Sequence, residues 1–86
     1  MKLPPRGSQN RSILEYLIYQ GELSSLDAIK ELGVLRLPNR ISELRKKYGV
    51  KIAQKTVRHP VRPKVHWNVY WLENEEIERW SKLLAS

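Results

Sequence analysis

Residues 24–52 read SSLDAIKELG, VLRLPNRISELRKKYG and VKI in succession, and they predict two short helices separated by a glycine turn. Ser24 and Asp27 have the spacing of a capping box, in which two side chains bond free backbone N–H groups at a helix start. Gly33 suits the left-handed position that ends a helix. The buried face of this first helix is expected to consist of Leu26, Ala28, Ile29 and Leu32.

The second helix is expected to span residues 37–48. Pro38 is tolerated there because it falls in the first turn, where no intrahelical N–H bond is lost. Val34 and Leu35, between the two helices, are expected to pack into the core. The apolar face of the second helix repeats at helical spacing as Leu37, Ile41, Leu44 and Tyr48. The opposite face carries Arg36, Asn39, Ser42, Glu43 and Lys46.

The flanking sequence predicts a third helix and a hairpin. Residues 8–20 place an apolar stripe at helical spacing behind a serine that can act as N-cap. Residues 50–58 are rich in β-branched side chains, residues 59–64 contain two prolines, and residues 65–72 alternate as a strand does. The alternation in residues 65–72 does not decide which set of side chains is buried.

The last part of the chain predicts a further amphipathic helix. Asn74 can cap it, and the acidic pair Glu75 and Glu76 favours the positive N-terminal end of a helix. Its apolar face would contain Ile77, Trp80, Leu83 and Leu84. We expect the three tryptophans to be core residues, with Trp80 as the exception, because a terminal amphipathic helix often packs against a partner subunit.

These elements predict an α+β fold of the winged helix-turn-helix type, with a three-helix core, a β-hairpin wing and an extra C-terminal helix. The expected organisation is a flexible basic arm over residues 1–7, the winged helix-turn-helix domain over 8–72, and the C-terminal helix over 73–86 as a dimer contact. A chain of 86 residues has room for one small core.

Composition narrows the function. Residues 36–64 carry ten basic side chains and one acidic side chain, a formal charge of +9 in a chain whose net charge is +7. Such a concentration of positive charge favours binding to a polyanion such as nucleic acid. A basic surface that is only solvated would give the same pattern in the sequence. No apolar run reaches bilayer-spanning length and the N-terminus lacks a signal-peptide pattern, so we expect a cytoplasmic protein without a membrane partner.

Catalytic chemistry is scarce. His59 and His66 are the only histidines and there is no cysteine, so no zinc-ligand pattern is present. No phosphate-binding glycine loop occurs either. We therefore expect no enzyme activity, no catalytic residues, no metal and no cofactor.

The second helix of a helix-turn-helix enters the major groove of double-stranded DNA, and its N-terminal part meets the base edges. Arginine can bond guanine and asparagine can bond adenine through two atoms each. The base-reading candidates are Arg36, Asn39 and Arg40, followed by Ser42 and Glu43. The cations expected to contact the DNA backbone from the helix end and the wing are Arg45, Lys46, Lys47, Lys51, Lys55, Arg58, Arg62 and Lys64.

Some candidates have competing roles. Arg40 could form an ion pair with Glu31 or Glu43, and Glu43 could instead pair with Lys47 four residues later. Arg62 lies between two prolines at the expected wing tip. The prolines would stiffen this loop and lower the entropy lost on binding, so Arg62 is also a candidate for the minor groove.

Several short motifs from residue 8 to residue 72 resemble small winged helix-turn-helix proteins of bacteriophages and prophages. They are Asn10-Arg11-Ser12-Ile13-Leu14, Ala28 to Gly33, Arg36-Leu37, Arg40-Ile41, Leu44-Arg45, Tyr48-Gly49 and Tyr70-Trp71-Leu72. The resemblance implies DNA binding in a bacterial host cell. Pro38 replaces a small residue of that pattern and HPVRPK replaces a glycine-rich wing turn, while the helix after Leu72 lies outside it.

Three hypotheses follow. The first is a double-stranded DNA-binding protein that acts as a transcriptional regulator or as an architectural factor in recombination. The second is a module that binds or inhibits a host or phage protein, and the third is a single-strand or RNA binder that uses wing aromatics. Salt separates them, because release of counterions makes DNA binding weaken steeply as salt rises.

Overall fold

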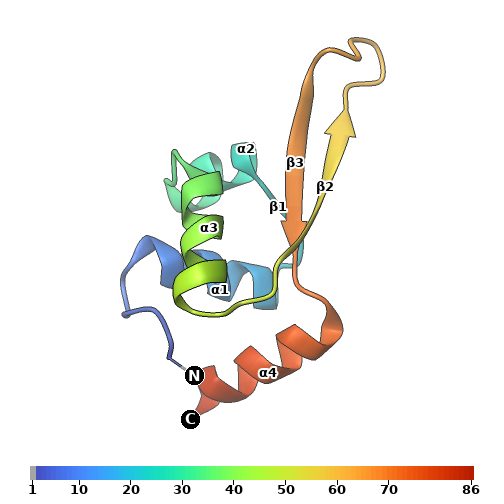
Figure 1. The fold of residues 1–86 in the computed structure, drawn as a ribbon. Helices are drawn as coiled ribbons and strands as arrows, with labels where there is room; N and C mark the ends of the chain where they lie inside the picture. The colour runs from blue at the N-terminus through green and yellow to red at the C-terminus, as the bar shows by residue number, and fades with distance from the viewer. Residues whose placement is uncertain (1) are drawn as a thin grey trace.

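The computed structural model describes residues 2–86. Its helices gather at one end and a long β-hairpin extends away from them, so that the principal-axis extents are 46 × 25 × 22 Å (Figure 1). The elements in chain order are α1 (Gln9–Tyr19), β1 (Leu23–Ser24), α2 (Ser25–Asp27), the π-helical turn η1 (Ala28–Leu32), α3 (Leu37–Lys47), β2 (Ala53–Arg58), β3 (His66–Trp71) and α4 (Asn74–Ala85). The predicted α+β winged-helix architecture is confirmed.

The helix starts and stops follow the local signals of the sequence. The Ser8 hydroxyl accepts a bond from the backbone N–H of Arg11 at 3.1 Å and begins α1. The capping box of Ser24 and Asp27 forms with both of its bonds. Gly33 ends η1 with a φ of 66°, in the left-handed region where glycine is favoured over other residues.

The core lies where the helices meet the inner end of the hairpin. Ile13, Leu14 and Leu17 of α1 are fully buried there. On the predicted apolar face of α3, Leu37, Ile41 and Leu44 are buried as expected. Tyr48, which follows the helix, is half-buried. The remaining buried members include Leu23, Val50, Tyr70, Leu72 and Trp80.

Three apolar residues of the helix-turn-helix that we expected inside are exposed, so those predictions were wrong. Ala28 and Leu32 face the core, and Ile29 turns outward in the wider π-helical winding of η1. Leu26, two residues before Ala28, lies in α2 on the side of the helix away from the core. Leu35 is 78% exposed.

Leu35 projects because the residues around it are held in place. The Val34 N–H donates to the Ala28 carbonyl at 3.0 Å, which keeps Val34 buried, and Leu37 is buried two residues after Leu35. The intervening Leu35 and Arg36 bulge into solvent.

The sheet has the strand order β1-β3-β2, with antiparallel pairs from Ala53↔Trp71 to Arg58↔His66. The sheet shows which alternating set of side chains in residues 65–72 faces the core. Tyr70 lies opposite Leu23 and belongs to the core, whereas the alternate side chains of β3 lie on the other face. On that other face Val69 is buried outside the main core. Trp67 is 38% exposed, so the prediction that it is a core residue was wrong.

Helix α4 is part of the domain. Trp80 is fully buried, and its indole N–H donates to the Glu76 carboxylate at 2.7 Å. The same carboxylate accepts the backbone N–H of Lys51 at 3.3 Å and pairs with Arg79 at 3.3 Å. Trp80 was therefore wrongly assigned to a partner surface, because the core of its own chain encloses it.

The start of α4 also differs from the prediction. Glu73 occupies the N-cap position and Asn74 is the first helical residue. Glu73 makes no capping bond with its side chain, which instead accepts the indole N–H of Trp71 at 3.0 Å.

Part of the segment before α1 packs against the domain. Leu3 contacts the core, Pro4 is buried, and the Pro4 carbonyl accepts a bond from Arg11 at 3.0 Å. The flexible basic arm expected over residues 1–7 stays a prediction, and residue 1 lies outside the described part of the chain.

Candidate nucleic-acid interface

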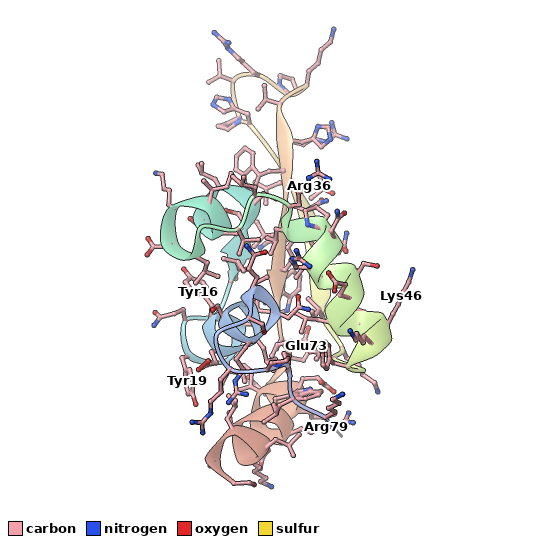
Figure 2. All side chains as sticks on the ribbon, turned by 90° about the vertical axis from the view of Figure 1, so that its left-hand side faces the viewer. Tyr16, Tyr19, Arg36, Lys46, Glu73 and Arg79 are labelled. Carbon is pink, nitrogen blue, oxygen red and sulfur yellow. The ribbon has the colours of Figure 1, made fainter. Side chains whose placement is uncertain are left out.

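Helix α3 presents its polar face outward because its apolar face is anchored. Leu37, Ile41 and Leu44 are buried, which fixes the rotation of the helix about its axis. Pro38 sits in the first turn, as predicted. Figure 2 shows Arg36 at the end of α3 that is nearer the wing tip and Lys46 projecting from the part of α3 that is farther from it.

Arg36 and Asn39 are the base-reading candidates that the structure leaves available. Both are exposed, and within residues 2–86 neither side chain makes a hydrogen bond or an ion pair. Arg36 is the N-cap residue of α3, so its side chain starts at the end of the helix that meets the bases in this class of fold.

Arg40 and Glu43 are held by the protein. The Arg40 guanidinium forms a close ion pair with the Glu43 carboxylate and donates to the Gln9 side chain at 3.0 Å. Of the alternatives considered for Arg40, the structure shows Glu43 and not Glu31. The Glu43–Lys47 pair does not form among the described residues, and Lys47 instead lies 5.9 Å from the ring centre of Tyr48.

Ser42 and Lys46 complete the outward face of α3. Ser42 is half-buried, whereas Lys46 is exposed and lies in the last turn of the helix. Lys51, in the connection that follows, has an exposed side chain as well.

Arg45 has a structural role that sequence reasoning missed. Its guanidinium donates to the Ile52 carbonyl at 2.7 Å and to the Gln54 side chain at 2.9 Å. The C-terminal end of α3 is thereby bonded to the start of β2. Because both acceptors lie beyond the end of α3, no pattern within the helix could reveal them.

The two faces of the hairpin have different chemistry. Gln54 contacts Arg45 of α3, so the side chains that share its face lie on the α3 side of the sheet. This face continues with the bonded pair Thr56 and Asn68 at 2.9 Å and then with Arg58 and His66. The inner face of the wing is therefore polar and prolongs the polar surface of α3.

Lys55 lies on the opposite face. It pairs with Glu22 at 3.4 Å and sits 5.7 Å from the ring centre of Trp71. The structure thus places Lys55 away from α3, although the sequence grouped it with the other wing cations.

The wing loop carries the remaining candidates. Arg62 and Lys64 are exposed at the tip, and within residues 2–86 their side chains have no polar partner. Arg58 is exposed at the end of β2 and donates to the Pro63 carbonyl at 3.3 Å.

Charge is separated along the molecule. The basic residues 36–64 include α3 and the wing, whereas Glu73, Glu75, Glu76 and Glu78 lie in or next to α4. Figure 1 shows α4 at the end of the molecule opposite the wing tip. This arrangement would orient the α3 and wing side toward a polyanion.

No group of three or more histidine, cysteine or acidic side chains within residues 2–86 is arranged to hold a metal ion. Within the same range, no helix has the length and apolar character needed to cross a bilayer.

Comparison with known families agrees with this architecture. The winged helix-turn-helix domain family matches residues 8–74, which covers α1 through the first residue of α4. The chain belongs to this family of domains, whose members in general bind DNA. Comparison with curated proteins and with solved structures finds no match.

Proposed function

We propose that this protein binds double-stranded DNA sequence-specifically, with α3 in the major groove and the wing loop in the adjacent minor groove. One observation carries the proposal: at the N-terminal end of α3, Arg36 and Asn39 are exposed, and their side chains have no polar partner among residues 2–86. The cations of the wing tip lie beyond this end on the same elongated molecule (Figure 1).

The chemistry of the two residues suits base recognition. Arg36 has a planar set of donors that matches guanine O6 and N7, and the Asn39 amide can both donate to and accept from adenine. The other base-reading candidates, Arg40, Ser42 and Glu43, are less available to DNA than Arg36 and Asn39. The Arg40 guanidinium already donates to Glu43 and Gln9, so it has fewer free donors for a base, and the Arg40–Glu43 pair contributes less unless DNA replaces it.

Phosphate contacts would come from the exposed cations around this surface. Lys46, Lys47 and Lys51 lie near the C-terminal end of α3, and Arg62 and Lys64 lie on the wing loop. Such contacts supply affinity and orientation with little sequence information. Arg45, Lys55 and Arg58 have partners within the protein and serve the interface chiefly by shaping it.

The biological role we propose is that of a transcriptional regulator or an architectural factor in recombination. The test is selection of bound sequences from a random duplex pool with the full chain. A defined motif supports sequence-specific recognition, and an inverted repeat within it implies a homodimer. If no sequence is enriched, sequence-specific regulation is rejected.

A second candidate is a protein-binding role. The exposed Leu26 and Ile29 lie on α2 and η1, which gives that part of the surface apolar character. DNA affinity with a steep dependence on salt supports the first proposal. Absence of duplex binding at low salt would favour the second, and preference for single strands would point to the exposed Trp67 instead.

A further inference from the structure

The wing loop is organised around one imidazole ring. His59 follows β2 directly, and its Nδ1 accepts the backbone N–H of Val61 at 3.1 Å and that of Arg62 at 3.0 Å. The backbone N–H of His59 donates to the Val65 carbonyl at 2.8 Å and extends the ladder of the hairpin by one pair. One residue therefore bonds both the base of the loop and its tip.

The bonds to Nδ1 do what an aspartate or asparagine does in a turn. Such short polar side chains accept backbone N–H groups two or three residues further on and fix a local reversal of the chain. Here they satisfy two N–H groups that would otherwise be exposed, at the point where the chain reverses direction. At this reversal Val61 is 80% exposed, and Arg62 is exposed to solvent as well.

The second half of the loop is fixed independently. The Val65 N–H donates to the Arg62 carbonyl at 2.9 Å, which closes a turn with Pro63 at the position that proline favours. Arg58 donates to the Pro63 carbonyl at 3.3 Å. The backbone of Arg62 thus has bonds on both sides, whereas its side chain has no polar partner within residues 2–86.

No residue from 59 to 65 belongs to the hydrophobic core or packs against it. The bonds of His59 therefore order only the loop itself. The bonds of Glu76 and Arg45, by contrast, join separate elements of the domain. A loop that is ordered in advance loses less conformational entropy when it binds.

We infer that His59 is a positioning residue for DNA binding, which holds the wing tip so that Arg62 is presented to the minor groove. This inference rests on the proposed function and adds a residue that itself touches no DNA. It requires an acceptor at the Nδ1 position, which a neutral imidazole with its proton on Nε2 provides.

The test is a double-mutant cycle with the full chain and a duplex from the selection described above. His59→Ala removes the acceptor, Arg62→Ala removes the proposed contact, and the third variant carries both changes. We expect His59→Ala to weaken binding by about 2- to 10-fold, the range that corresponds to ordering one side chain or loop segment. In the Arg62→Ala background the same change should have no further effect.

A conservative variant separates the acceptor from the ring. Asn can accept the same type of N–H bond, so His59→Asn should restore most of the affinity that His59→Ala loses. All variants should unfold at the same urea concentration as the parent, because the loop lies outside the core.

The outcomes distinguish this inference from the function on which it rests. If Arg62→Ala leaves affinity unchanged, the wing contact in the proposed function fails, and this inference fails with it. If Arg62→Ala weakens binding but His59→Ala does not, only the role of His59 is rejected. Equal effects of His59→Ala in both backgrounds, or no recovery with His59→Asn, would also reject it.

Discussion

Helix α3 and the wing loop present cations in opposite ways. On α3 the backbone is an ordinary helix, and some of its charged side chains are bonded to the protein, as Arg40 and Arg45 are. In the wing loop the protein bonds the backbone, and the Arg62 side chain is left without a polar partner among residues 2–86. Equal charge on the two elements therefore does not mean equal availability to a ligand.

The largest effect on binding should come from α3. Asn39→Ala should weaken binding to a selected duplex by roughly 5- to 100-fold, the range of a lost two-bond contact to a base, and should scarcely change binding to random DNA. Competition titrations with both kinds of duplex measure the difference. Equal losses on the two duplexes would mean that Asn39 does not read bases, and α3 would then resemble the wing in supplying affinity alone.

The next effect concerns stability rather than binding. Arg45→Ala removes two charge-assisted bonds between α3 and the wing and should lower the free energy of unfolding by about 1–2 kcal/mol. Urea unfolding followed by circular dichroism checks this value. Lys46→Ala is the matched control one residue away, because its exposed side chain should leave stability within about 0.5 kcal/mol. Identical stabilities would show that Arg45 is not structural.

The same lysine tests the phosphate contacts. Lys46→Ala should weaken binding to selected and random duplexes by similar factors and should reduce the slope of log affinity against log salt by about 1. Affinities measured at several salt concentrations give the slope. A loss restricted to the selected duplex would instead move Lys46 into the base-reading set.

The smallest effect should be that of Arg40→Ala. Its ion pair with Glu43 is about 39% exposed on each side, so its loss should lower stability by less than about 1 kcal/mol. Affinity for the selected duplex should change less than it does in Asn39→Ala. A loss as large as that of Asn39→Ala would show that DNA displaces Glu43 and that the bonded state of Arg40 does not limit its use.

Signals that act over a few residues were enough to predict the framework. The caps at Ser8 and Ser24, the stop at Gly33 and the position of Pro38 depend on neighbours within one helical turn, and all are present. The hairpin follows in the same way from a two-residue alternation interrupted by prolines.

What the sequence could not supply depends on distant partners or on unusual winding. The outward position of Ile29 follows from the π-helical turn, which a search for ordinary helical spacing does not detect. Lys55 lies on the face of the sheet away from α3, where it pairs with Glu22, 33 positions earlier in the chain. Such pairings become visible only when the sheet register is known.

The burial of Trp80 and the exposure of Trp67 give the molecule two optical probes of its own. The Trp80 indole lies in the core and bonds Glu76, so its emission follows the integrity of the helical end. Trp67 is 38% exposed on the wing and can be reached by a soluble quencher such as iodide. In a Trp71→Phe variant, which removes the third, half-buried tryptophan, quenching and emission wavelength can therefore follow the wing and the core separately without a label.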